Sequence, residues 1–526
     1  MTTTRGLLEH AQRRAESLRD RYRAAGFWSA APVDLLREAA RRYPDSTALV
    51  ERGVALSYGH LDAAVDSSAR AMAAAGVEPG EPVVVVAGND VSSVITLHAA
   101  ARVDAVTLLV ARSSGAAAIL DIAARSGALH GVAPGWASPE SELGGPCRWL
   151  GAPSAATVET LEHGVAPPVR AADEPSLVLY TSGTTSRPKG VIHSHSTLIK
   201  AARNYIAAAG LGPSDRVLLI SPMASVTGVL QAVYIAPLLG IPVVLEDAWS
   251  PAGTADLLLA TDATWYGGPD RLLDRLLDEI GRRRGEVPLR AVYLGGTTLD
   301  RRIVERVEKD FGIVVMRAYG SSEVPVSTSG RRDEPAAVRH ADDGAPLADV
   351  DVRVGSSVEP TECCITGPHT FLGYTDAADD AVAFDDGWFR TGDVAELVDG
   401  RVRIVGRLKD IVIRNGLKIP AAEVDEAVAR VPGVSECAAF PVPDATTGEH
   451  LAVAVVLEPG VSLSLPDIVA ALTAAGLPKY KLPEEIVYWD RPLPLNANGK
   501  VQRNMLKGLS VGLPRSLSAR IVPLPG

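Results

Sequence analysis

The chain has 526 residues, of which 47% are hydrophobic and 22% charged, and its formal net charge is −11. This length and balance predict a globular protein with two or more domains. The acidic balance argues against a nucleic-acid-binding surface, which would be basic, although a few placed cations could still bind an anionic ligand. Four cysteines are too few for a disulfide framework, so a reducing cytoplasm is the simplest expected compartment.

The amino terminus reads MTTTRGLLEHAQRRAESLRDRYRAAGFW and predicts a solvated amphipathic helix. It lacks the apolar core of a signal peptide. Elsewhere no apolar run is long enough to cross a bilayer, so no membrane span is expected. The abundance of Ala, Arg and Gly indicates a bacterial genome.

Short apolar runs alternate with helical patterns through about the first four hundred residues. The pattern at 47–76 predicts a strand, a turn at Gly53, a second strand and a helix. Continuous Val, Ile and Leu strands between helices indicate parallel sheets that are covered on both faces. In such folds phosphate sites lie at the carboxyl ends of strands, where Tyr180, Gly295 and Tyr319 occur. Further strands are expected at 81–88, 215–223, 240–246, 290–296 and 312–320.

The last quarter of the chain has a different pattern. Asn415 and Gly416 form a hairpin signal between two short strand patterns, and strands then alternate with helices. These patterns predict a second, compact domain of mixed strands and helices. We therefore expect an N-terminal domain at 1–409 and a C-terminal domain at 410–526, with an irregular tail from about residue 509.

The stretch YTSGTTSRPKGVIHSH, 180–195, places small hydroxyl residues, glycines and a lysine directly after an apolar run. It is not a Walker A loop, because Pro188 precedes Lys189 and a glycine follows. The backbone N–H groups and hydroxyls of this loop can nevertheless surround phosphate oxygens, and the lysine can hold or close the loop. Considered by itself, a Ser/Thr-rich surface turn explains the loop equally well.

Four more motifs follow: AYGSSE at 318–323, DGWFRTGDVAEL at 386–397, GRLKDIVIRNGLKI at 406–419 and PLPLNANGKVQR at 492–503. In this order and spacing, the five motifs resemble the adenylate-forming superfamily, which includes acyl-CoA synthetases, adenylation domains and luciferases. The resemblance extends from about residue 43 to residue 506. It implies an α/β fold: a large N-terminal domain with parallel-rich sheets covered by helices, and a small mobile C-terminal α+β domain.

The resemblance also implies a nucleotide site. The loop would hold the β- and γ-phosphates of ATP, and Glu323 would hold Mg²⁺. Tyr319 would lie along the adenine, while Asp393 and Arg407 would contact the ribose. Lys500 would offset charge on the attacking carboxylate and the α-phosphate. The implied catalytic residues are Thr184, Lys189, Glu323 and Lys500. The implied ATP-binding residues are Thr181, Ser182, Gly183, Thr184, Thr185, Lys189, Gly295, Gly296, Thr297, Tyr319, Gly320, Ser321, Ser322, Glu323, Asp393, Arg407 and Lys500.

An acyl pocket, a hinge and a coenzyme A tunnel are implied elsewhere. Asp410 would be the hinge about which the small domain rotates between the two half-reactions. Gly416 would line the coenzyme A tunnel, and Lys418 would meet the phosphate-bearing thiol nearby. Small residues favour an apolar acyl pocket of some volume. The implied pocket residues are Met223, Ala224, Ser225, Thr227, Gly228, Gly320 and Val324.

Several positions depart from the family pattern. Ser186 stands where the family usually has glycine, and serine would cost about 1 kcal/mol there if the position needs a positive φ. Ala224 and Ser225 stand where an aromatic residue or histidine is frequent, and Ala421 stands where proline is usual. These departures bear on the substrate class more than on the reaction.

The expected activity is ATP-dependent conversion of a hydrophobic carboxylic acid, with bulky and cyclic acids included, to acyl-AMP and then to acyl-CoA. An enzyme that loads a carrier protein is one alternative. The absence of Asp from PMASVTG, and of a carrier domain after Arg503, favours free coenzyme A. A catalytically weakened homologue that binds nucleotide or acyl-adenylate is a second alternative. A homodimer, common among relatives, is also open.

Overall fold

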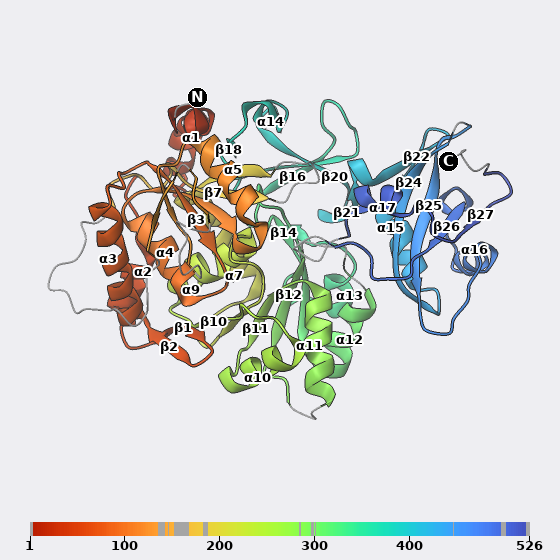
Figure 1. Ribbon diagram of the computed structural model, residues 1–526, viewed down its shortest axis with the longest axis horizontal. Helices are drawn as coiled ribbons and strands as arrows, with labels where there is room; N and C mark the ends of the chain where they lie inside the picture. The colour runs from red at the N-terminus through yellow and green to blue at the C-terminus, as the bar shows by residue number, and fades with distance from the viewer. Residues whose placement is uncertain are drawn as a thin grey trace. The chain divides into compact units, whose positions relative to one another are not determined.

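The computed structural model describes residues 4–134, 143–145, 147–151, 168–181, 188–282, 286–295, 299, 301–444, 446–495 and 501–521 (Figure 1). The chain divides into two compact units. The first comprises Met1–Val352 and Ile365–Phe389, and the second comprises Arg353–Cys364 and Arg390–Gly526. Three strands, β16 (Asp351–Val354), β17 (Glu362–Thr366) and β20 (Trp388–Val398), therefore contribute residues to both units.

A seven-stranded sheet forms one half of the first unit. Its central strands are parallel and almost wholly apolar, because both faces are covered; all four valines of β3 are fully buried. At one edge of the sheet, strands β8 and β18 run antiparallel to their neighbours. The strand order is β18 (Gly373–Tyr374), β8 (Lys189–Ser194), β7 (Pro175–Thr181), β4 (Val106–Ala111), β3 (Pro82–Ala87), β5 (His130–Val132) and β6 (Arg148–Leu150).

A nine-stranded sheet forms the other half. Strands β13, β12, β11, β9, β10 and β1 run parallel, and antiparallel strands close both edges. The order is β15 (Ala345–Pro346), β14 (Thr328–Ser329), β13 (Val314–Tyr319), β12 (Ala291–Gly295), β11 (Trp265–Gly268), β9 (Val217–Leu219), β10 (Val243–Leu245), β1 (Thr47–Glu51) and β2 (Val54–Ser57). The predicted turn at Gly53, with a φ of +79°, joins the last two strands.

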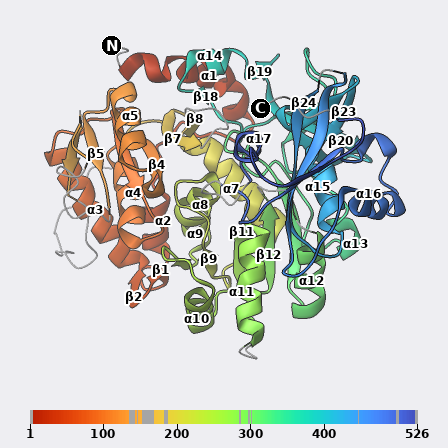
Figure 2. The same cartoon turned by 45° about the vertical axis from the view of Figure 1, so that its right-hand side comes forward.

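Helices lie between and outside the two sheets (Figures 1 and 2). Helix α4 contacts β3 and β4 of one sheet and β1 of the other, and α7 packs against β7 and β8. Other helices cover the outer faces, so the predicted α/β architecture is confirmed. The helices are α1 (Thr4–Ala24), α2 (Leu35–Arg42), α3 (Tyr58–Ala74), α4 (Val91–Arg102), α5 (Ala116–Ser126), α7 (His195–Ala209), α8 (Val226–Val229), α9 (Ala236–Leu239), α10 (Pro251–Thr261), α11 (Asp270–Arg282), α12 (Arg301–Phe311), α13 (Ala336–Arg339) and α14 (Ala377–Ala381).

The predicted amino-terminal helix exists as α1, but it is not simply a solvated helix. Its apolar residues Leu8, Ala11, Ala15 and Tyr22 are buried in the core cluster that also contains strands β3 and β4. The charged residues of the helix occupy the remaining faces, as an amphipathic pattern requires. Among the described residues, no helix is long and apolar enough to cross a membrane.

The second unit contains the hairpin of β20 and β21 (Arg401–Arg407) and a sheet with helices α15 (Ala421–Ala429), α16 (Leu465–Ala474) and α17 (Arg503–Leu509). The predicted hairpin at Asn415-Gly416 joins β22 and β23, and both residues have positive φ. Residues 515–517 pair with β26, so the expected tail is not irregular throughout. The sheet consists of β23 (Leu417–Pro420), β22 (Ile411–Arg414), β25 (Gly448–Leu457), β26 (Glu485–Tyr488) and β27 (Arg515–Leu517), with β24 (Val434–Asp444) also paired to β25.

Candidate functional site

The predicted phosphate loop lies between two paired strands of the seven-stranded sheet. Thr181 at the end of β7 pairs in register with Lys189 at the start of β8. The loop is thus a connection at the carboxyl end of a parallel strand, where such folds place phosphate sites. Ser182, Gly183, Thr184, Thr185 and Ser186 lie outside the described residues.

The motif AYGSSE begins with the last two residues of β13, which pairs in parallel with β12. Gly295 lies opposite Ala318, and a Cβ on Gly295 would come within 2.5 Å of the Ala318 carbonyl oxygen. A side chain on Gly320 would likewise clash with the backbone at Val326. Both glycines are therefore required by close backbone approach, whatever they also contribute to a nucleotide pocket. Gly296 and Thr297 lie outside the described residues.

Three contacts fix Glu323, the predicted magnesium ligand. Its backbone N–H donates to Ser321 Oγ at 3.2 Å, and its carbonyl oxygen accepts from the Phe371 N–H at 2.8 Å. Its carboxylate Oε1 accepts from the Tyr374 hydroxyl at 2.7 Å. Burial and the neighbouring carboxylate raise the pKa of the Tyr374 phenol, which therefore remains a donor. The side chain of Glu323 thus has a defined direction.

A buried histidine supports the same motif from behind. His193 of β8 is fully buried, and its Nε2 lies 2.7 Å from the carbonyl oxygen of Ser322. A carbonyl only accepts, so Nε2 carries the proton and donates. Burial lowers the pKa of His193 to about 4, which keeps the ring neutral near pH 7. The residue before Glu323 is thereby tied to the strand that follows the phosphate loop.

Lys189 has one acidic neighbour, from α14, and one aromatic neighbour, from β18. Its Nζ lies 2.7 Å from Asp379 Oδ1 and 5.1 Å from the centroid of the Tyr374 ring. His193, Tyr374 and Asp379 were not predicted as site residues from the sequence. His193 could have been found as a histidine within the apolar strand that follows the loop. Tyr374 and Asp379 are distant in sequence from the motifs that they contact.

Five of the predicted acyl-pocket residues lie just before or within α8, whereas Gly320 and Val324 follow β13. Met223 and Val324 are buried, and Ser225 uses its hydroxyl to cap the helix, accepting from the Gly228 N–H at 3.1 Å. A Cβ on Gly228 would clash with the Pro222 carbonyl, so this glycine is structural as well. A π-helical turn, Leu230–Ile235, follows directly and was not predicted; such turns are frequent at functional sites.

The predicted ribose and hinge residues belong to the second unit. Asp393 and Arg407 face each other across β20 and β21, with 3.3 Å between Arg407 Nε and Asp393 Oδ1. Asp410 ends a short 3₁₀ turn and lies 3.9 Å from Arg503 Nε. Lys418 on the predicted tunnel hairpin pairs with Glu359 at 2.6 Å. Lys500 lies outside the described residues.

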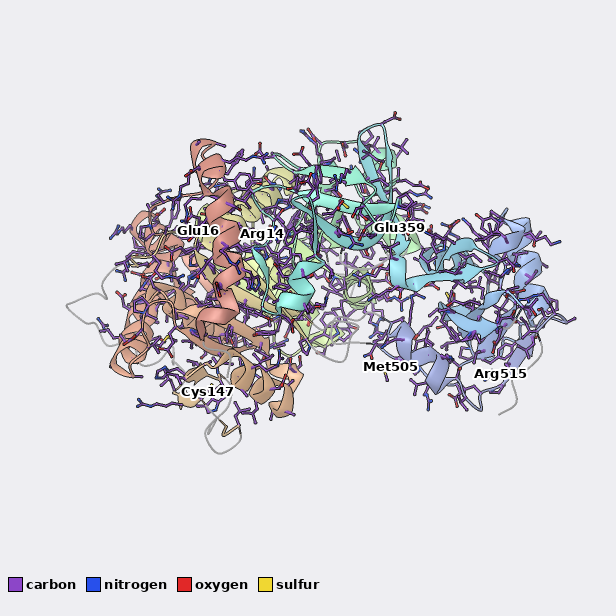
Figure 3. The ribbon with its side chains drawn as sticks, turned by 90° about the horizontal axis from the view of Figure 1, so that it is seen from above. Arg14, Glu16, Cys147, Glu359, Met505 and Arg515 are labelled. Atoms are coloured by element: carbon purple, nitrogen blue, oxygen red, sulfur yellow. The ribbon has the colours of Figure 1, made fainter. Side chains whose placement is uncertain are left out.

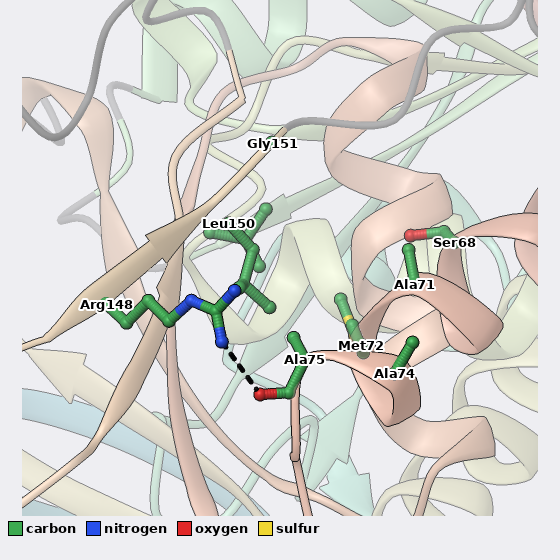
Figure 4. Close-up of a pocket in the computed structure, with 9 residues that line it drawn as sticks. Ser68, Ala71, Met72, Ala74, Ala75, Arg148, Leu150 and Gly151 are labelled. Atoms are coloured by element: carbon green, nitrogen blue, oxygen red, sulfur yellow. Dashed lines mark hydrogen bonds between the residues drawn. The ribbon is translucent and has the colours of Figure 1, made fainter.

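A cavity of about 380 Å³ lies elsewhere in the first unit, between the end of α3 and strand β6 (Figure 4). Met72 and Leu150 line it, and Arg148 donates to the Ala75 carbonyl at 3.2 Å beside it. None of the predicted site residues lines this cavity. It is therefore not the predicted acyl or nucleotide pocket.

The described residues contain no cluster of three or more His, Cys, Asp or Glu that could hold a metal by themselves. A single carboxylate is nonetheless the donor set that Mg²⁺ uses when phosphate and water supply the remaining ligands. Glu323 fits this role, because its side chain is partly exposed and Tyr374 donates to Oε1 rather than to Oε2.

Residues 36–375 match the family model described as AMP-binding enzyme, and residues 423–500 match the one described as AMP-binding enzyme C-terminal domain. The chain belongs to the AMP-binding enzyme family. The predicted resemblance to adenylate-forming enzymes is thereby confirmed. The motifs that carried it lie in both matched regions and between them.

Relatives of this AMP-binding enzyme cover nearly its whole length. A salicylyl-CoA synthase / salicylate adenylyltransferase from a Streptomyces species is 30% identical over 95% of this chain and 97% of its own. The medium-chain fatty-acid–CoA ligase of Escherichia coli K12 is 28% identical over 94% of this chain and 93% of its own. The o-succinylbenzoate coenzyme A synthetase of Bacillus subtilis, solved with ATP and magnesium ion, has a TM-score of 0.79 at 23% identity, covering 90% of this chain and 99% of that one; it shares the fold.

Proposed function

We propose that this AMP-binding enzyme is an acid–thiol ligase that uses ATP, Mg²⁺ and coenzyme A. In the first half-reaction a carboxylate oxygen attacks the α-phosphorus of ATP, the bond to the bridging oxygen of the β-phosphate breaks, and acyl-AMP and pyrophosphate form. In the second, the thiol of coenzyme A attacks the acyl carbonyl, loses its proton to solvent and expels AMP. The relatives named as CoA synthase and CoA ligases support this reaction class.

The observation that carries the proposal is the arrangement of Lys189 and Glu323 about Tyr374. The Lys189 Nζ is 5.1 Å from the centroid of the Tyr374 ring, and the Glu323 carboxylate accepts a hydrogen bond from the Tyr374 hydroxyl at 2.7 Å. A cation and a carboxylate beside a loop at the end of a strand suit a nucleoside triphosphate and its metal ion: the cation suits the phosphates and the carboxylate suits the metal. When bound, Mg²⁺ would supply positive charge to the phosphate oxygens as pyrophosphate leaves.

The second unit would contribute the ribose contacts and the transient cation. Asp393 is an acceptor for both ribose hydroxyls, and Arg407 orients its carboxylate. Lys500 would approach during adenylation, with rotation of the C-terminal domain at 410–526 about Asp410. Gly416 and Lys418 would then meet coenzyme A in the second half-reaction.

The acid is proposed to be hydrophobic. None of the predicted pocket residues is charged, and Met223 and Val324 are buried, so a second charge on the substrate would find no partner among them. A carrier-protein thiol is the alternative acceptor; one relative is named for both CoA and adenylyl transfer. A cytoplasmic location and a homodimer remain predictions.

The test is pyrophosphate release across aliphatic, aromatic, amino and polycyclic acids, with and without coenzyme A. Thioester formation that requires coenzyme A supports the ligase and identifies the acid class. Pyrophosphate release without thioester points to a carrier protein. ATP binding without turnover of any acid favours a weakened nucleotide-binding homologue and contradicts the proposal.

A further inference from the structure

Helix α1 packs against the segment 373–381, which comprises strand β18 and helix α14, although more than three hundred residues separate them in sequence. Figures 1 and 2 show α1, β18 and α14 side by side from both directions. All three elements belong to the first unit. The family resemblance assigned no role to α1 or to this segment.

The segment contacts two predicted phosphate-site residues of this unit, Glu323 and Lys189. Tyr374 donates its hydroxyl to Glu323 Oε1 at 2.7 Å, and Asp379 Oδ1 pairs with Lys189 Nζ at 2.7 Å. The Tyr374 backbone is itself tied to β8, because β18 pairs with Val191 and Ile192. One short segment therefore directs a carboxylate from one sheet and a lysine from the other.

Helix α1 in turn holds the segment. His10 Nε2 bonds the backbone carbonyl of Tyr374. The Arg14 guanidinium lies 3.2 Å from the centroid of the Phe384 ring and 3.9 Å from Asp380, whose Oδ1 accepts from the Tyr374 N–H at 3.1 Å. Both backbone groups of Tyr374 are thus connected to α1, one directly and one through Asp380.

The geometry of α1 suits such a support. Figure 3 shows Arg14 on the side of α1 that faces α14, whereas Glu16 lies on the opposite side. Ala11 and Ala15 are fully buried, so the helix is anchored in the core independently of its polar contacts. Space is also limited, since a Cβ on Gly373 would lie 2.6 Å from Asp380 Oδ1 and 3.1 Å from the His10 ring.

We propose that α1 and the segment 373–381 form a bracket that orients the metal–phosphate site. In this bracket Tyr374 is the positioning residue for Glu323, and Asp379 is the positioning residue for Lys189. The inference rests on the proposed function for the identity of the ligand, a magnesium–nucleoside triphosphate. Tyr374 restrains the carboxylate through Oε1, which leaves Oε2 aimed for the cation. Without the phenol, Glu323 regains rotamer freedom that must be lost when the metal binds.

The test is calorimetric titration with the non-hydrolysable analogue AMP-PNP, first in excess Mg²⁺ and again in EDTA. For Tyr374→Phe we expect the affinity in Mg²⁺ to fall about tenfold, as for loss of a hydrogen bond to a charged group, and the affinity in EDTA to stay unchanged. Tyr43→Phe, which removes a hydroxyl from a partly exposed tyrosine, is the matched control and should change neither value.

Two further variants separate positioning from folding. Asp379→Asn should weaken AMP-PNP binding about threefold both with and without Mg²⁺, because it acts on Lys189 rather than on the metal ligand. Arg14→Ala leaves Tyr374 in place and should reproduce a smaller, magnesium-dependent loss of about twofold. Thermal unfolding of each variant identifies any general loss of structure.

Equal loss for Tyr374→Phe in Mg²⁺ and in EDTA would overturn the bracket, and so would an unchanged affinity in both. These outcomes are separate from the proposed function. A wild-type chain that binds AMP-PNP in a magnesium-dependent way but converts no acid would contradict the ligase and leave the bracket standing. If the wild type makes acyl-CoA but Tyr374→Phe binds AMP-PNP as tightly as the wild type, the ligase is supported and the bracket is contradicted.

Discussion

The residues proposed for the phosphate side of the nucleotide and those proposed for its ribose side are supported by different physical means. Glu323 is held by the buried residues Tyr374 and, through the neighbouring Ser322, His193. Asp393 is paired across a two-stranded hairpin with Arg407, whose side chain is 45% exposed. Buried neutral donors fix a geometry, whereas a solvent-exposed ion pair contributes little and is screened by salt. The difference indicates that Glu323 is held more firmly in the first unit than Asp393 is in the second.

The largest expected effect belongs to Lys500, whose proposed role is confined to adenylation. Lys500→Ala should slow acyl-AMP formation by about 100- to 1,000-fold, because the charge that develops in the transition state loses its partner. Thioester formation from supplied acyl-AMP should be nearly unchanged. Single-turnover assays of each half-reaction measure the two rates. Lys507→Ala, at an exposed position of α17, is the control. Equal loss in the two halves would remove the assigned role.

The buried support of the phosphate side is tested by His193→Leu. The variant leaves the Ser322 carbonyl without its donor, so the free energy of unfolding should fall by about 2 kcal/mol. Denaturant unfolding measures this change. His60→Leu, at an exposed position, should change it by less than about 0.5 kcal/mol. An unchanged stability for His193→Leu would show that this hydrogen bond does not support the motif.

The ribose side should respond in the opposite way, with a change in binding and little change in stability. Asp393→Asn keeps the shape of the side chain but weakens an acceptor of two hydroxyls, and the KM for ATP should rise about tenfold. Unfolding should shift by less than about 1 kcal/mol, since the pair with Arg407 is partly exposed. Asp399→Asn, in the turn of the same hairpin, is the control. A large loss of stability would make Asp393 a structural residue.

The smallest expected effect, counted per pH unit, is a difference in how the stability depends on pH. Burial lowers the pKa of His193 from 6.5 to about 4, so the unfolded chain binds this proton first as the pH falls. The stabilisation is therefore complete above pH 6.5 and is lost between pH 6.5 and 4. Over that window the stability of the wild type should fall more steeply than that of His193→Leu, by about 1 kcal/mol per pH unit. Parallel profiles would show that the histidine is not buried and neutral.

Much of the fold could be predicted because local patterns determine it. Continuous valines in β3 require a strand covered on both faces, and Asn415-Gly416 permits the positive φ values of a two-residue hairpin turn. The amino-terminal helix was predicted as solvated, yet Ala11 and Ala15 are fully buried. Alanines carry a weak hydrophobic signal, so the sequence pattern did not reveal that this helix packs on a sheet.

The candidate site was predictable where its residues lie within one motif and not where they meet through tertiary structure. Glu323 and Lys189 stand in recognisable motifs. Tyr374 and Asp379 contact them from a segment with no motif of its own, and only the antiparallel pairing of β18 with β8 brings that segment to the site. The capping role of Ser225 was hidden for a different reason, since a hydroxyl beside a short helix reads equally well as a pocket residue.

The central claim, that the chain activates an acid through an adenylate and transfers it to coenzyme A, is tested most directly by the products of a single reaction with an accepted acid. We expect AMP, pyrophosphate and acyl-CoA in equal amounts, with no ADP. Formation of ADP and phosphate, or of thioester without AMP, would contradict it.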